Sequence, residues 1–296
     1  MNNLSKNQGM LLVFLSGICW GFSGACAEYI TRVRNFNIDI LIPYRLLISG
    51  FCLLIFYKIR YKKIDFSIFK HKYHLIRLLI YSFLGIFVAQ YFYFYGVSLS
   101  NAAVATVIQF ISPIFIILIV CIEEKRFPKI TEVLAFSLVF IGAFLLSTNA
   151  NFEKLLITPK ALIICLLGML GAVANAIIPR KISKIYSPIL VLAYALIVSG
   201  VFSFIYNKVW QKTFDMDFML LMAIFWVIFI GTIIALAFYI VGLNIIGAAK
   251  TTIISSSTPI IAAICSYFWL GTSLFIFQII GFILIIFAIL LSSFKD

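Results

Sequence analysis

A run of polar side chains interrupts one of the apolar stretches near the C-terminal end of the sequence. Ser255, Ser256, Ser257 and Thr258 come directly before Pro259. Polar groups that face hydrocarbon are costly, so such residues usually face the interior of a helix bundle or a water-filled cavity. Hydroxyl groups can also bond to the preceding helical turn or hold two helices together. Four consecutive polar side chains point around a whole helix, which favours a cavity wall for part of the run.

Amides, further hydroxyls and amphipathic rings occur within other apolar stretches. Amide side chains can hydrogen-bond a ligand or a neighbouring helix. Tyr and Trp rings can close on an organic cation or on a flat apolar molecule. The complete set of candidate substrate-binding residues is Trp20, Gln90, Tyr93, Gln109, Ser112, Asn175, Tyr239, Ser255, Ser256 and Thr258.

Charged residues within the apolar stretches are few. Arg45 lies several residues inside its stretch, and Glu28 lies at a similar depth. The two could pair, but a structural role is favoured, in which Arg45 extends to the membrane surface with Asp39 as its partner.

The composition indicates that lipid surrounds most of the chain. Apolar residues make up 64% of the sequence and charged residues 11%. A helix needs roughly 20 apolar residues to cross a bilayer. Stretches of that kind predict ten transmembrane helices, near 9–30, 37–57, 74–97, 99–122, 130–148, 159–178, 187–206, 217–242, 246–269 and 273–293.

The positive charges predict the orientation of these helices. With a cytoplasmic N-terminus, Lys62, Lys125 and most other basic residues fall in inside loops, whereas Lys154 and Lys212 fall in outside loops. This bias predicts a multi-pass protein of the inner (cytoplasmic) membrane with both termini in the cytoplasm. The net charge of +13 is then explained by lipid headgroups rather than by nucleic acid.

No cofactor or metal site is expected. The six cysteines fall within predicted helices without a Cys-x-x-Cys pair, and the two histidines lie at a basic loop. The phosphate-binding pattern GxxxxGK[ST] is absent, and so is a soluble segment large enough to hydrolyse ATP.

An internal repeat divides the chain. A shift of 146 residues places Pro113 on Pro259 and aligns predicted helices 3 to 5 with helices 8 to 10. We therefore expect two five-helix repeats, 1–150 and 151–296. Because five is odd, the repeats would be inverted, as in many secondary transporters. Each proline also frees a carbonyl group one turn earlier, which could meet a ligand or could only bend the helix.

Four stretches together resemble the EamA-type drug/metabolite transporter superfamily: SGICWGFSG, YRLLISG, NAAVATVIQFISPIF and GAAKTTIISSSTPIIAA. The resemblance covers nearly the whole chain. It implies a ten-helix basket whose cavity is lined by helices 1, 3, 4, 6, 8 and 9. The sequence departs from the family at Leu270-Gly271-Thr272, where the family often has Leu-Gly-Glu, so the second half lacks that carboxylate.

These observations predict a secondary transporter or facilitator, not an enzyme, that exports an amino acid or similar small metabolite. Predicted helices 3, 4, 6, 8 and 9 hold no acid away from their ends, which leaves Glu28 as the candidate proton carrier on a cavity helix, so we expect weak or absent proton coupling. Efflux of lipophilic cationic drugs is the alternative within transport, and a membrane-embedded enzyme that acts on lipid-linked substrates is the alternative from another class. The expected partners are the substrate and the lipid bilayer. The oligomeric state is left open, a monomer included.

Overall fold

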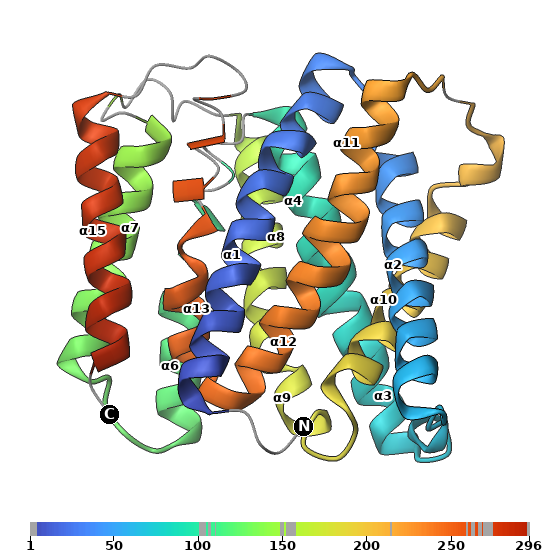
Figure 1. Ribbon diagram of the computed structural model, residues 1–296, viewed down its shortest axis with the longest axis horizontal. Coiled ribbons are helices and arrows are strands. Elements are labelled where there is room, and N and C mark those ends of the chain that lie inside the picture. Colours follow the sequence, from blue (N-terminus) through green and yellow to red (C-terminus); the bar gives the residue numbers. More distant parts are fainter. Residues whose placement is uncertain are drawn as a thin grey trace.

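Helices account for the regular structure of the protein wherever the computed structural model describes the chain (Figure 1). The structure describes residues 5–100, 105, 108–109, 111–148, 151, 158–213, 215–258, 260–261, 264–265, 268 and 275–294. The prediction of an all-α protein is confirmed.

Six helical stretches among the described residues are long and apolar enough to cross a membrane. A crossing takes roughly 20 residues, which each of them reaches or closely approaches. The protein is therefore a multi-pass membrane protein. The six stretches contain α1 (Lys6–Glu28), α2 (Ile38–Tyr61), α3 (Lys72–Ile80) with α4 (Val88–Leu99), α8 (Pro159–Ile177) with α9 (Pro179–Ile182), α10 (Pro188–Tyr206), and α11 (Phe218–Ile228) with α12 (Ala235–Ile246).

Four further helices fall in the remaining predicted segments. Shorter apolar stretches lie in α6 (Ser112–Glu123), α7 (Ile130–Thr148) and α15 (Ile276–Phe294). Helix α13 (Ala248–Ser255) begins the segment predicted over 246–269, the rest of which lies partly outside the described residues. The number of ten membrane crossings stays a prediction.

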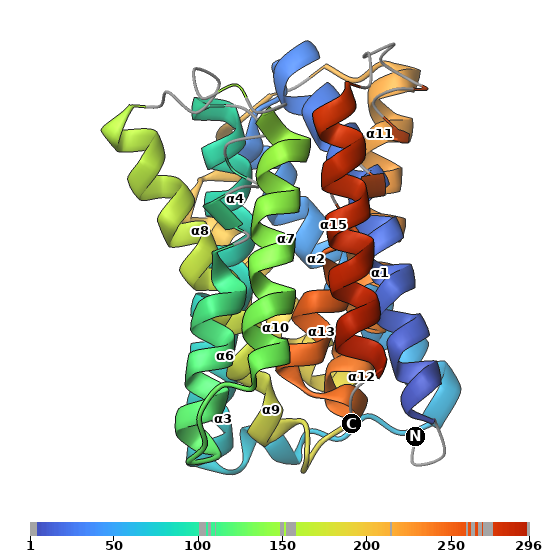
Figure 2. The ribbon, with the colours of Figure 1, turned by 90° about the vertical axis from the view of Figure 1, so that its left-hand side faces the viewer.

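The helices pack in pairs that join the two halves of the sequence. Helix α1 packs along α12, α2 along α10, α4 along α8 and α7 along α15, the last pair being prominent in Figures 1 and 2. Glycines allow two of these close approaches. A Cβ atom on Gly171 of α8 would lie 2.4 Å from the Ala89 backbone nitrogen of α4, and one on Gly242 of α12 would lie 2.3 Å from the Val13 side chain of α1.

Irregular turns interrupt the helices at positions that the 146-residue shift relates. The stretch α3–α4 is π-helical over Tyr81–Phe87, and α11–α12 is π-helical over Phe229–Ile234. Helix α6 begins at Ser112, directly before Pro113, instead of continuing the helical residues at 108–109. Helix α13 likewise ends at Ser255, and Ser256 begins a turn. Such turns leave backbone groups available for other partners.

Ion pairs connect the halves at both ends of the bundle. At one end Arg34 pairs with Asp217, and Lys212 Nζ lies 2.7 Å from Asp39 Oδ2. At the other end Arg180 Nη1 lies 2.8 Å from Glu123 Oε2. This second end also holds the start of α1 and the end of α15 (Figures 1 and 2).

Candidate functional site

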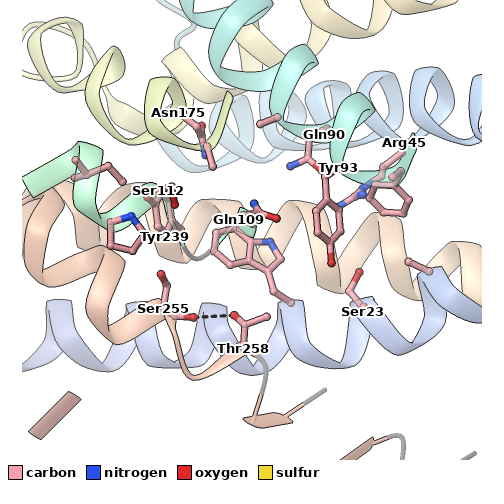
Figure 3. A pocket seen from close by; sticks show the side chains of 18 residues that line it. Ser23, Arg45, Gln90, Tyr93, Gln109, Ser112, Asn175, Tyr239, Ser255 and Thr258 are labelled. Atoms are coloured by element: carbon pink, nitrogen blue, oxygen red, sulfur yellow. Dashed lines mark hydrogen bonds between the residues drawn. The ribbon is translucent and has the colours of Figure 1, made fainter. Parts of the chain in front are cut away.

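A cavity of about 220 Å³ lies between the helices at the centre of the bundle (Figure 3). Both halves of the sequence contribute to its wall. The wall contains polar side chains, aromatic rings and small residues, and the small residues leave room for the cavity. The lining residues are Trp20, Ser23, Gly24, Ala27, Arg45, Ala89, Gln90, Tyr93, Phe94, Gln109, Ser112, Pro113, Ile116, Ala172, Asn175, Tyr239, Ser255 and Thr258.

Nine of the ten candidate residues named from the sequence line this cavity. They come from α1, α4, α6, α8, α12 and α13 and from helical residues just before α6 and just after the end of α13. The exception is Ser256, which is fully buried and lies outside the lining. Its neighbour Ser257 is also buried and faces α1, where a Cβ atom on Gly17 would lie 2.1 Å from the Ser257 hydroxyl oxygen. Ser255 and Thr258 therefore face the cavity while Ser256 and Ser257 are buried away from it, because the chain leaves the helix and turns at Ser256 and Ser257.

The uncharged polar groups are held by specific contacts. The Tyr81 hydroxyl donates a hydrogen bond of 3.2 Å to the Asn175 side-chain oxygen. Tyr81 belongs to the π-helical turn of α3–α4 and is 1% exposed. Because this bond engages the oxygen of Asn175, its amide N–H groups are the part left to face the cavity. The Thr258 hydroxyl donates to the Ser255 carbonyl oxygen at 2.8 Å, which orients its lone pairs.

Aromatic rings form another part of the wall. The Trp20 and Tyr239 rings are 5.1 Å apart between centroids, so α1 and α12 together present one aromatic surface. Tyr93 lies beside Arg45 in Figure 3. Such rings supply apolar contact area together with a polar edge.

Arg45 corrects the interpretation drawn from the sequence. Its side chain is not extended to the membrane surface but is 3% exposed and lines the cavity. Its Nε donates a hydrogen bond to the Thr232 hydroxyl, and Nη2 lies 3.5 Å from the Gly231 carbonyl oxygen. Asp39, the expected partner of Arg45, instead accepts hydrogen bonds from Lys212 and from the Tyr91 hydroxyl.

The π-helical turn of α11–α12 explains how Arg45 is held. The Thr232 hydroxyl donates its own proton to the Val227 carbonyl oxygen at 2.8 Å, five residues earlier. Its lone pairs are therefore free to accept from Arg45. The Ser49 hydroxyl, one turn after Arg45 on α2, lies 3.4 Å from the Ile228 carbonyl oxygen. The family resemblance placed helix α2 outside the cavity. Its Arg45 side chain nevertheless lines the cavity, held there by the π-helical turn of α11–α12.

Three residues of this site were not among the candidates predicted from the sequence: Ser23, Arg45 and Tyr81. Ser23 lies in the SGICWGFSG stretch, and Arg45 in YRLLISG, so the motifs gave a signal for both. The Glu28 side chain lies outside the described residues. Within the described part of the chain, no group of three His, Cys, Asp or Glu residues could hold a metal ion.

The chain is similar to known membrane transporters in sequence and to a solved structure in fold. The sequence profile of the EamA-like transporter family matches residues 7–148 and 159–294. The uncharacterized inner membrane transporter YicL of Salmonella typhimurium is 30% identical over 289 residues, 98% of this chain and 96% of YicL. The uncharacterized transporter YyaM of Bacillus subtilis is 22% identical, over 74% of this chain and 73% of YyaM. One solved crystal structure shares the fold, with a TM-score of 0.80 at 15% identity over 98% of this chain and 97% of its own. The chain belongs to the EamA-like transporter family, as its motifs predicted.

Proposed function

We propose that this protein is a secondary transporter or facilitator that exports a neutral or zwitterionic small metabolite of the amino acid class. The observation that carries the proposal is the central cavity, whose wall combines uncharged polar groups with aromatic rings. Its volume of about 220 Å³ is below the range of about 300–1,000 Å³ typical for pockets that hold drug-sized ligands, which favours a small metabolite.

The proposed architecture is ten transmembrane helices in two inverted five-helix repeats, residues 1–150 and 151–296. Two matches of one family profile support the duplication. The pairing of α1 with α12 and of α4 with α8 is what a two-fold axis in the membrane plane would generate. The interruptions at Ser112 and Ser255 lie at the cavity, and broken helices are common at transporter binding sites.

The proposed location is the cytoplasmic membrane, with both termini in the cytoplasm. The similarity to YicL, which is described as an inner membrane transporter, supports the location. The basic loops around Lys62 and Lys125 support the orientation, because cytoplasmic loops carry an excess of Lys and Arg.

Efflux of lipophilic cations is less well supported than export of amino acids. The one charged side chain among the described lining residues is Arg45, which repels a cation. A membrane-embedded enzyme would need paired acids or a nucleophile with a base, and the described cavity wall contains neither arrangement.

The test is counterflow exchange in proteoliposomes that are loaded with each neutral amino acid in turn. Ala172→Phe adds a ring to the cavity wall and should reduce exchange to the level of protein-free liposomes. Ile163→Phe, on the same helix but 58% exposed, is the matched control and should retain wild-type exchange. Wild-type exchange by a folded Ala172→Phe protein would refute the cavity as the transport path.

A further inference from the structure

One hydrogen-bonding group in the cavity wall has no partner among the residues that the structure describes. Arg45 Nη1 is buried and makes no hydrogen bond to any of them, whereas Nε contacts Thr232 and Nη2 contacts the Gly231 carbonyl group. The guanidinium carbon lies 4.9 Å from the centroid of the Phe94 ring, which covers one face of the group. The Nη1 edge is therefore the part of the guanidinium group that remains to be satisfied.

A buried guanidinium group with neutral partners lacks an anion. Arginine retains its proton under physiological conditions, so it cannot become neutral to relieve its desolvation. Removing a charge from water costs several kcal/mol unless an opposite charge offsets the cost. Among its described partners, Thr232 and Gly231 supply oxygen dipoles but no charge, so the described part of the site leaves the charge of Arg45 without a counter-ion.

The described residues supply no carboxylate to Arg45. Asp39, six residues earlier on α2, is held by Lys212 and Tyr91. The other carboxylates that form ion pairs in the described part of the chain, on Glu123, Glu124, Glu132 and Asp217, lie at the ends of the bundle.

The surroundings of Arg45 suit one end of a small polar molecule. Gln90, Tyr93 and Ser23 lie near Arg45 at the same end of the cavity in Figure 3. Ser112, Asn175, Ser255 and Tyr239 lie toward the other end. A carboxylate at Arg45 would thus leave the rest of the molecule against uncharged groups and rings. Carboxylates match guanidinium groups in geometry as well as in charge.

We propose that Arg45 binds the carboxylate of the transported molecule through Nη1, so that substrates of this transporter must carry a carboxylate. This inference rests on the proposed function and narrows its substrate class. An amino acid fulfils the requirement, and an amino acid amide of the same size and shape does not.

The experiment measures the thermal unfolding midpoint of the purified protein with each of the common amino acids and, in parallel, with the matching amino acid amides. A ligand that binds only the folded state raises the midpoint. One or more acids should raise it for the wild-type protein, and the matching amides should not. Arg45→Gln should weaken acid binding roughly 10- to 100-fold, the range expected when a charged hydrogen-bond partner is lost.

Two further variants separate recognition from folding. Arg60→Gln removes an exposed arginine from the same helix and should bind acids as the wild type does. Arg45→Lys retains the positive charge but lacks the planar guanidinium group, so this variant should still prefer acids over amides, with reduced affinity for the acids. It therefore keeps the proposal testable if Arg45→Gln does not fold.

Several results would overturn the proposal. Equal stabilisation by acids and amides would show that the carboxylate is not recognised, and counterflow of both compounds would then leave the proposed transport function intact. Unchanged acid binding by a folded Arg45→Gln protein would overturn it as well. Stabilisation by inorganic phosphate, without a response to any amino acid, would show that Arg45 holds an inorganic anion instead.

Discussion

Gly171 allows α8 to approach α4 beside the cavity, and its replacement by alanine should measure how tightly this pair is packed. A Cβ atom at Gly171 would lie 2.4 Å from the Ala89 nitrogen and 2.6 Å from the Ala89 Cα atom, whereas ordinary contact begins at 3.4 Å. The helices would have to separate by about 1 Å, because backbone atoms cannot move away as a side chain can.

The expected loss of stability follows from two opposing effects. Overpacking of this kind costs about 1–3 kcal/mol, while replacing a helical glycine with alanine contributes about 0.5–1 kcal/mol of stability. Because the contact is with rigid backbone, the cost lies in the upper half of that range, and the net loss of about 1–2.5 kcal/mol should lower the unfolding midpoint by roughly 2–6 °C. Since Ala89 and Ala172 line the cavity, the separation should also change its width and alter transport.

The assay follows unfolding with a dye that becomes fluorescent on reaction with thiols. Cys26, Cys121 and Cys165 are buried, so they react as the protein unfolds. Gly24→Ala is the matched control, because a Cβ atom on Gly24 would meet no atom of the described residues within 4 Å. That variant should be as stable as the wild type or slightly more so. An unchanged midpoint for Gly171→Ala, or an equal decrease for Gly24→Ala, would refute the packing argument.

Three further predictions concern orientation, the transport path and coupling. Cysteine at position 208, in the exposed loop after α10, should react with an impermeant thiol reagent on intact cells, whereas cysteine at position 62 should not. The opposite pattern would invert the topology. Gln109→Leu should reduce counterflow about tenfold through the loss of one or two hydrogen bonds to substrate. Ser256→Val should instead reduce the folded yield. If Ser256→Val reduced counterflow and Gln109→Leu reduced the folded yield, Ser256 and not Gln109 would lie on the transport path. Glu28→Gln should retain counterflow exchange, since we expect flux to follow the substrate gradient. If a proton gradient alone drives accumulation and Glu28→Gln abolishes it, the facilitator interpretation is wrong.

The parts of the fold that depend on local sequence could be predicted, and the family could be named from its motifs. Hydropathy identified the long helices, since each apolar stretch carries its own signal. Asn175 and Gln90 line the cavity, because an amide in an apolar helix has few other places to go, and their contact with substrate stays a prediction.

The environment of Arg45 could not be predicted in the same way. Its depth in α2 was evident from the sequence, but its contact with Thr232 joins residues that are 187 positions apart. That contact also depends on a π-helical turn, which hydropathy does not reveal. For a similar reason, the sequence did not predict that Ser255 lines the cavity and Ser256 does not. Hydropathy shows how many polar groups a segment carries and not which neighbour each one faces.

The pairing of helices across the two halves constrains how the protein can change shape. If residues 1–150 moved as one rigid body against residues 151–296, α1 would separate from α12 and α4 from α8, and the contacts at Gly242 and Gly171 would be lost. A rotation that moves α1 with α12 as one arm and α4 with α8 as the other leaves those contacts intact. The moving bodies would then each combine both halves of the sequence, with the interrupted helices at Ser112 and Ser255 lining the cavity.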